Sequence, residues 1–211
     1  MAKSPTKSGN SRFRRITSVP KIRLVVLASG SGTLFQALID EQKTYQAQIV
    51  GLVTDVPCQA IDRAKAAGIQ VTTVAMENDR NSWDKKLSVA IESLNPDLVV
   101  SAGFMRILGT AVLEKFEGKI INTHPALLPN FPGAHAVKDA LAAGAKETGS
   151  TIHFVDAGVD TGEVIVQEAI AISPTDTEDS LHERIKQVER KLLVQVVGDF
   201  VSGKISPRAR S

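Results

Sequence analysis

The sequence contains one cysteine, few aromatic residues and no apolar run long enough to cross a bilayer. A single cysteine, Cys58, cannot form a disulfide within the chain, which is typical of a reducing compartment. Cysteines are too few, and the four histidines too scattered, to predict a structural zinc site. Because the chain also lacks the apolar core of a secretory signal, we expect a cytoplasmic protein with no membrane contact and no metal.

Acidic residues are absent from the first 21 residues, which carry six positive charges. Removing these charges from the formal net charge of +2 leaves about four net negative charges on residues 22–211. The body of the chain is therefore mildly acidic, which argues against nucleic-acid binding. Residues 1–20 are basic, polar and poor in apolar side chains, so we predict a disordered tail. A transit peptide, or a start codon placed too far upstream, would also explain it.

Apolar segments that alternate with helical patterns predict an α/β fold with a mostly parallel, Rossmann-like sheet. We expect strands at 22–28, 48–54, 70–74 and 97–101, with helices at 34–41, 58–67 and 80–94 between them. Two later strands, 149–155 and 163–168, are joined by a short loop and predict an antiparallel hairpin. A long C-terminal helix follows at 178–201. The length suits one domain, predicted at 21–205 and followed by a C-terminal tail at 206–211.

A short strand pattern at 119–121 ends abruptly at the segment Asn122-Thr123-His124-Pro125. Pro125 cannot donate to a sheet ladder and favours an extended His124, so Asn122 and His124 should point to the same side. An amide donor and an imidazole beside one spot suit acyl transfer, which needs oxyanion stabilisation and proton transfer. The proline-broken segment 127–133 would form a wall beside them. Taken alone, the segment fits an ordinary turn around a hydrogen-bonded histidine at least as well.

The turn Ser29-Gly30-Ser31-Gly32-Thr33 joins the first strand to the first helix. Small residues there let the backbone approach an anion at a helix N-terminus. A dinucleotide fingerprint needs a third glycine, which is missing, so we favour a single phosphate group as the ligand. A tight turn that simply requires glycine remains the alternative.

Three further segments have both a functional and a structural interpretation. Residues 102–108 offer an apolar lining for a flat ring, or ordinary core. Asp160 could orient His124 and favour the imidazolium, or bond to its own turn. Glu189 could accept hydrogen bonds from sugar hydroxyls, or lie in solvent on the last helix. The residue pattern alone leaves each pair of alternatives open.

The segments Asn122–Pro129, Phe131-Pro132-Gly133 and Asp160-Thr161-Gly162 closely resemble the folate-dependent formyltransferases. The resemblance extends from about Ile22 to the end of the last helix and is closest to members that act on glycinamide ribonucleotide. It implies a single-domain Rossmann-like formyltransferase fold. It also implies transfer of the formyl group of 10-formyltetrahydrofolate to the amine of glycinamide ribonucleotide, in de novo purine biosynthesis. A homodimer is an expectation from the resemblance alone.

The resemblance also implies roles for individual residues. His124 would be the general acid and base, Asn122 would steady the formyl oxygen, and Asp160 would raise the histidine pKa and organise a water. The substrate phosphate and ribose would be held by Gly32, Thr33, Leu34, Lys186, Gln187, Val188 and Glu189. The folate pocket would be lined by Arg80, Met105, Arg106, Ile107, Leu108, Asn122, Asp156, Ala157, Gly158, Val159 and Asp160. His135 and His153 would support the site from outside it.

One departure from the family pattern is Leu34, where members often carry a polar residue, typically asparagine. Leu34 still offers its backbone N–H, so the departure puts phosphate affinity in doubt, but not the reaction. The alternatives to this assignment are another folate-dependent formyltransferase, a formyltetrahydrofolate hydrolase, or a non-catalytic nucleotide-binding module. The last would have no need for Asn122, His124 and Asp160 together.

Overall fold

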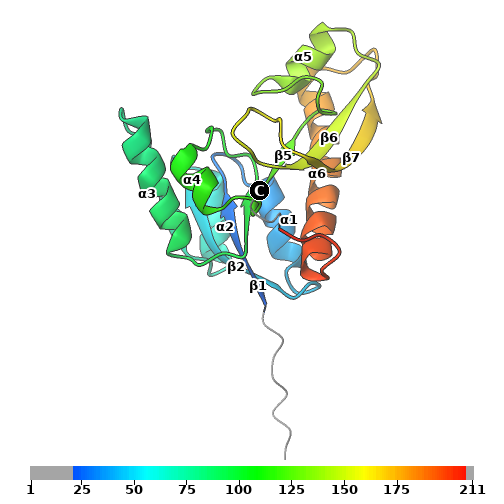
Figure 1. The fold of residues 1–211 in the computed structure, drawn as a ribbon. Helices are drawn as coiled ribbons and strands as arrows, with labels where there is room; N and C mark the ends of the chain where they lie inside the picture. Colours follow the sequence, from blue (N-terminus) through cyan, green and yellow to red (C-terminus); the bar gives the residue numbers. More distant parts are fainter. Residues whose placement is uncertain (1–20, 208–211) are drawn as a thin grey trace, which may run out of the picture.

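A computed structural model describes residues 21–207, and these form a seven-stranded sheet flanked by helices (Figure 1). The predicted tail at 1–20 and most of the predicted tail at 206–211 lie outside the described residues. The strands are β1 (Ile22–Leu27), β2 (Ala47–Thr54), β3 (Val71–Thr73), β4 (Leu98–Ser101), β5 (Ile120–His124), β6 (Glu147–Phe154) and β7 (Val164–Ala171). The helices are α1 (Thr33–Glu41), α2 (Gln59–Ala66), α3 (Arg80–Glu92), α4 (Thr110–Lys115), α5 (Ala136–Ala142) and α6 (Glu178–Val201). Within residues 21–207, no helix combines the length and the apolar character needed to cross a membrane.

The sheet has the strand order β3-β2-β1-β4-β5-β6-β7. The first five of these strands are mutually parallel, whereas β6 runs antiparallel to both β5 and β7. The predicted α/β fold, with its C-terminal hairpin and long last helix, is confirmed. The strand order reverses between β1 and β4, and ligands of such sheets collect at the carboxyl ends of the strands near that point.

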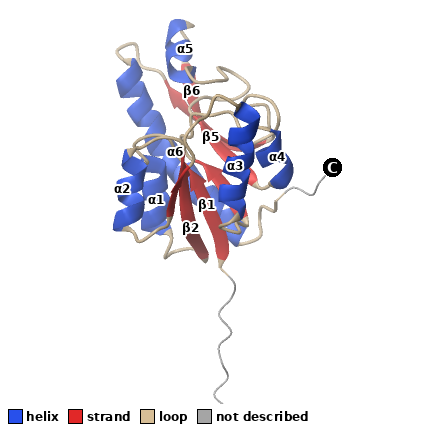
Figure 2. Cartoon of the chain, turned by 90° about the vertical axis from the view of Figure 1, so that its left-hand side faces the viewer, coloured by secondary structure: helices blue, strands red, loops and turns tan. Residues whose placement is uncertain are grey.

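The two faces of the sheet bury separate apolar cores. Along β1, Leu24 and Val26 pack with α1, α2 and α6, whereas Val25 and Leu27 pack with α3 and α4. This alternation follows from the period of two along a strand, and it explains why β1 is apolar at nearly every position. Figure 2 shows α1, α2 and α6 on one side of the sheet and α3 and α4 on the other.

Two local predictions were wrong. We expected the fifth strand to end at Ile121, but β5 continues to His124 because the backbone of Asn122–His124 pairs with β6. Such pairing depends on a segment distant in the sequence, so no local pattern could predict it. We also assigned no helix to Thr110–Lys115, which is α4. The buried carboxylate of Asp84 on α3 accepts hydrogen bonds from backbone N–H groups at the start of α4, which explains why so short a helix forms there.

Candidate active site

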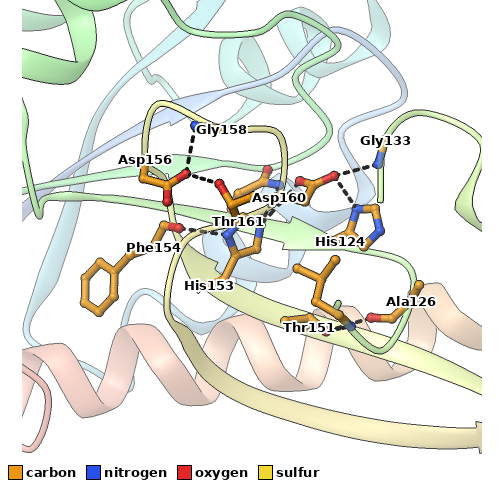
Figure 3. Close-up of polar contacts among 12 residues, drawn as sticks. His124, Ala126, Gly133, Thr151, His153, Phe154, Asp156, Gly158, Asp160 and Thr161 are labelled. Carbon is orange, nitrogen blue, oxygen red and sulfur yellow. Dashed lines mark hydrogen bonds and ion pairs between the residues drawn. The ribbon is translucent and has the colours of Figure 1, made fainter. Parts of the chain in front are cut away.

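A buried polar cluster lies where β5 and β6 meet the loop 156–162 (Figure 3). Oδ2 of Asp160 lies 3.3 Å from Nδ1 of His124, and its Oδ1 lies 3.5 Å from Nε2 of His153. Asn122 joins the cluster through its Nδ2 atom, which is 3.2 Å from the same Nε2 of His153. The two histidines are only 3% and 2% exposed. One carboxylate, two imidazoles and one amide therefore share a single site that is largely shielded from water.

Backbone carbonyls determine which ring nitrogens carry hydrogen. Nε2 of His124 lies 2.8 Å from the carbonyl oxygen of Phe131, and Nδ1 of His153 lies 2.8 Å from that of Phe154. A carbonyl can only accept, so both nitrogens are protonated. The nitrogen of His124 that can gain or lose a proton is therefore Nδ1, which faces the carboxylate. Nε2 of His153 faces both the amide of Asn122 and the carboxylate of Asp160, and it donates to that carboxylate only when the ring is protonated.

The surroundings shift the pKa values of the carboxylate and of one ring. The contact with His153, helped by the Gly133 N–H at 2.8 Å, lowers the pKa of Asp160 to about 2 against the opposing effect of burial. Burial lowers the pKa of His124, although the charge of Asp160 and the carbonyl of Phe131 act in the opposite direction. At neutral pH the carboxylate is thus ionised, while the resting imidazole of His124 is ready to accept a proton.

Strand pairing and one glycine bring these side chains together. The antiparallel register of β5 and β6 places His153 opposite Asn122. Asp160 comes from the loop that leaves β6 and returns over the cluster, and it adopts a left-handed φ of 55°. A Cβ atom at Gly162 would overlap the carbonyl oxygen of Phe154, so only glycine allows the loop to pass this close to the end of β6.

The proline-broken segment 125–133 is anchored beside the cluster by two side chains from the hairpin. The Thr151 hydroxyl donates to the carbonyl of Ala126 at 2.6 Å and accepts from the N–H of Leu128 at 3.2 Å. Gln167 on β7 donates to the Leu128 carbonyl at 2.7 Å. These bonds hold the segment that supplies the Phe131 carbonyl, so the predicted wall also orients the histidine.

The glycine-rich turn ends at the N-terminus of α1, as predicted. Gly32 has a φ of 69°, and a Cβ there would lie 2.8 Å from the Cβ of Ala60. Arg63 on α2 supports the turn by donating from Nε to the Ser31 carbonyl at 2.8 Å. The first N–H groups of α1, which include those of Thr33 and Leu34, have no partner within the helix, so the phosphate site predicted here stays compatible with the fold. The Leu34 side chain itself packs in the core.

Glu189 lies on α6 beneath β5 and is 4% exposed, so the prediction of a solvated position is excluded. Burial is the main cause that raises the pKa of Glu189 to about 7, while a hydrogen bond from the Thr123 hydroxyl acts in the opposite direction. Thr123 is the strand residue between Asn122 and His124, so its side chain points to the opposite face of the sheet. The other predicted ribose residues lie on the preceding turn of α6: Lys186, Gln187 and Val188.

The loop between β4 and α4 exposes two apolar side chains, Met105 and Ile107, at 69% and 63%. Arg80 donates from Nη2 to the Ile107 carbonyl at 2.6 Å, and its guanidinium lies 4.6 Å from the ring centroid of Trp83. Leu108 is buried in the core behind the loop. The loop therefore combines a fixed backbone with an apolar outer surface, and its role as the folate side stays a prediction.

The contacts of the loop 156–160 distinguish the two interpretations that the sequence left open for Asp160. Asp156 is the turn residue, because its Oδ1 accepts from the Gly158 N–H and from the Thr161 hydroxyl. Asp160 instead bonds to Gly133 and to the histidines. The neighbouring positions Ala157, Gly158 and Val159 are exposed on the same loop.

Sequence reasoning underestimated His153 and found no role for the backbone of 131–133. His153 contacts both Asn122 and Asp160, rather than supporting the site from outside. His153 and Thr151 are two residues apart on β6 and lie opposite Asn122 and His124. This spacing could have indicated that His153 faces the same site. His135, by contrast, is exposed at the start of α5.

Comparison with known proteins places this site in a family. Residues 22–197 match the formyl transferase family, so the chain belongs to that family. The prediction that the protein is a formyltransferase is thereby confirmed. Phosphoribosylglycinamide formyltransferase of Mycobacterium tuberculosis (strain ATCC 25618 / H37Rv) is 48% identical over 200 residues, covering 93% of each chain. The trifunctional purine biosynthetic protein adenosine-3 of Drosophila melanogaster is 38% identical over 209 residues, which are 95% of this chain and 15% of that protein. The crystal structure of glycinamide ribonucleotide transformylase 1 from Symbiobacterium toebii gives a TM-score of 0.86 at 32% identity, covering 97% of both chains.

Proposed function

We propose that this chain transfers the formyl group of 10-formyltetrahydrofolate to the amine of glycinamide ribonucleotide, a step of de novo purine biosynthesis. Membership of the formyl transferase family and the similarity to phosphoribosylglycinamide formyltransferases support this reaction. The observation that carries the proposal is the buried pair of Asp160 and His124 beside Asn122. Such a group suits acyl transfer between two nitrogen atoms.

The first chemical demand is charge stabilisation at the formyl oxygen. The substrate amine attacks the formyl carbon, a C–N bond forms, and the carbonyl oxygen becomes an oxyanion. The amide of Asn122 stabilises that oxygen, and the ring of His124 joins it once Nδ1 has taken the proton of the amine. Because both side chains project from the same side of β5, they act on one reacting centre.

The second demand is proton transfer from the attacking amine to N10 of the departing folate, as the bond between the formyl carbon and N10 breaks. His124 moves this proton through Nδ1, since Nε2 is bonded to the Phe131 carbonyl. Asp160 favours the imidazolium form during the transfer. The products are tetrahydrofolate and formylglycinamide ribonucleotide, and no covalent enzyme intermediate is required.

Substrate binding follows from the segments around the cluster. The backbone N–H groups of Gly32, Thr33 and Leu34 at the N-terminus of α1 hold the phosphate, and Glu189 accepts from the ribose hydroxyls. The loop 102–108 and the loop 156–160 enclose the folate.

We further propose that the protein is a cytoplasmic homodimer. Light scattering, which measures the mass in solution, tests whether two chains associate.

The test is an assay of the purified chain with both substrates, followed by folate absorbance and by mass spectrometry of the ribonucleotide. We expect a formylated ribonucleotide that forms only when both substrates are present. The variant His124→Ala should be inactive, while His182→Ala, a histidine on α6 away from the cluster, should retain full turnover. Release of free formate without the amine substrate would indicate a hydrolase, and an unchanged spectrum would indicate a non-catalytic module; either result would refute the proposal.

A further inference from the structure

A buried carboxylate outside the active-site cluster, that of Asp55, lies at the place where the sheet reverses its strand order. Asp55 directly follows β2 and is 2% exposed. The loops that follow β1 and β4 converge on it, and they carry Ser29, Met105 and Arg106. Asp55 thus touches both the phosphate turn and the loop assigned to folate, although it belongs to neither.

Both oxygens of Asp55 are occupied, each by a different loop. Oδ1 accepts a hydrogen bond from the Ser29 hydroxyl at 2.6 Å, and the same hydroxyl accepts from the Met105 N–H at 2.9 Å. Oδ2 forms an ion pair with Nε of Arg106 at 2.6 Å. An arginine commonly binds a carboxylate through two parallel hydrogen bonds. Here Ser29 occupies the second oxygen, so Arg106 is held by Nε alone.

The remaining donors of Arg106 are therefore available to a ligand. Within residues 21–207 the structure records no hydrogen bond from either Nη atom, and the side chain is 36% exposed. The neighbouring arginine differs, because Arg80 uses Nη1 on the Met76 sulfur and Nη2 on the Ile107 carbonyl. Of the two guanidinium groups at this loop, only that of Arg106 has both Nη groups available to bind a second carboxylate.

We propose that Asp55 is a positioning residue that fixes Arg106 so that its two Nη groups bind a carboxylate on the glutamate tail of the folate donor. This inference rests on the proposed function, because it assigns an anchor for the same donor. Arg106 lies between Met105 and Ile107, whose exposed side chains suit the flat part of a ligand that also has an anionic end. Asp55 does not touch the donor itself.

The experiment compares two formyl donors, one with the glutamate tail and the corresponding pteroate capped as its methylamide, which carries no carboxylate and is called the pteroate donor. In Asp55→Asn the amide still accepts from Ser29, but its nitrogen cannot accept from Nε of Arg106. We expect the KM for the glutamate-bearing donor to rise about ten-fold, because a charged hydrogen bond is lost, while kcat changes less than about two-fold. The KM for the pteroate donor should change less than about two-fold.

The chain offers a matched control in the pair Asp176 and Arg184 at the start of α6. Their N···O distance is also 2.6 Å, and their side chains are 8% and 40% exposed. Asp176→Asn removes a similar ion pair outside the folate loop, so it should leave the KM values for both donors unchanged. An equal rise for both donors in Asp55→Asn would show a merely structural role and overturn the proposal.

A double-mutant cycle tests whether Asp55 acts through Arg106. Arg106→Gln should raise the KM for the glutamate-bearing donor alone, and the double variant should be no worse than Arg106→Gln. Additive losses would contradict the proposal. If Asp55→Asn does not fold, Ser29→Ala replaces it: the freed Oδ1 can draw one Nη inward, and the KM for the glutamate-bearing donor should rise about three-fold. No such rise would also overturn the proposal.

Calorimetry with unreactive tetrahydrofolate and the methylamide of tetrahydropteroate, which lacks a carboxylate, separates this inference from the proposed function. We expect the unmodified chain to bind tetrahydrofolate more tightly, and Asp55→Asn to lose that preference. A chain that shows the preference but transfers no formyl group would refute only the proposed function. A chain that transfers the formyl group without the preference would refute only the role of Asp55.

Discussion

Oδ2 of Asp160 lies 3.3 Å from Nδ1 of His124, the one ring nitrogen of that histidine that can change its protonation. Asp160 belongs to a loop after β6 and His124 to the end of β5, so the contact exists only in the folded chain. The Phe131 carbonyl fixes the other nitrogen. The relationship therefore determines both the direction of proton transfer and the residues whose replacement is most informative.

Replacing Asp160 with asparagine should reduce kcat by about 10² to 10⁴-fold while the fold survives. The amide preserves the shape of the side chain but removes the charge that favours the His124 imidazolium, so the pKa of His124 should fall further. Turnover with both substrates measures the loss, and circular dichroism with thermal melting checks the fold. Unchanged turnover in a folded variant would remove Asp160 from the site.

His153→Phe should lower kcat by roughly 10- to 100-fold, since the ring contacts both Asn122 and Asp160. Without His153, the pKa of Asp160 should rise toward its ordinary value, because this contact is the largest cause of its lowering. As the pH is lowered, kcat of the variant should therefore begin to fall at a higher pH than kcat of the unmodified protein. The matched control is His135→Ala, at an exposed position, which should leave turnover and its pH profile unchanged.

Glu189 should make the stability of the protein depend on pH. Its pKa is raised from an ordinary value of 4.5 to about 7, so its favourable contribution is fully present below pH 4.5 and is lost as the pH rises through 7. Glu189→Gln, which cannot ionise, should therefore be more stable than the unmodified protein at pH 8, by on the order of 3 kcal/mol. The difference should shrink at pH 5. Urea unfolding at both pH values measures it, and a difference independent of pH would contradict the assignment.

The two glycines of the phosphate turn should differ sharply. Gly32→Ala combines an unfavourable positive φ with a contact of 2.8 Å to Ala60, so the turn must shift and the KM for the ribonucleotide should rise about ten-fold or more. Gly30→Ala meets no atom within 4 Å, so neither the stability nor the position of the turn should change appreciably. Equal KM values for the two variants would place the phosphate elsewhere.

Local patterns were sufficient for most of the architecture. The apolar run of β1, the helix that ends before Pro96 and the stripe along α6 depend on neighbours within a few residues, which is why they could be predicted. The extension of β5 and the helix α4 could not, because a distant strand stabilises the first and the Asp84 carboxylate the second.

The sequence by itself determined the α/β alternation, the glycine turn before α1 and the motif of Asn122, His124 and Asp160, since each is written in adjacent residues or a family pattern. Only the tertiary structure decided that His153 joins that motif, that Glu189 is buried and that Asp55 holds Arg106. The physical reason is that strand register, burial and ion pairing connect residues far apart in the chain. Their energies depend on distances that exist only after the sheet has formed.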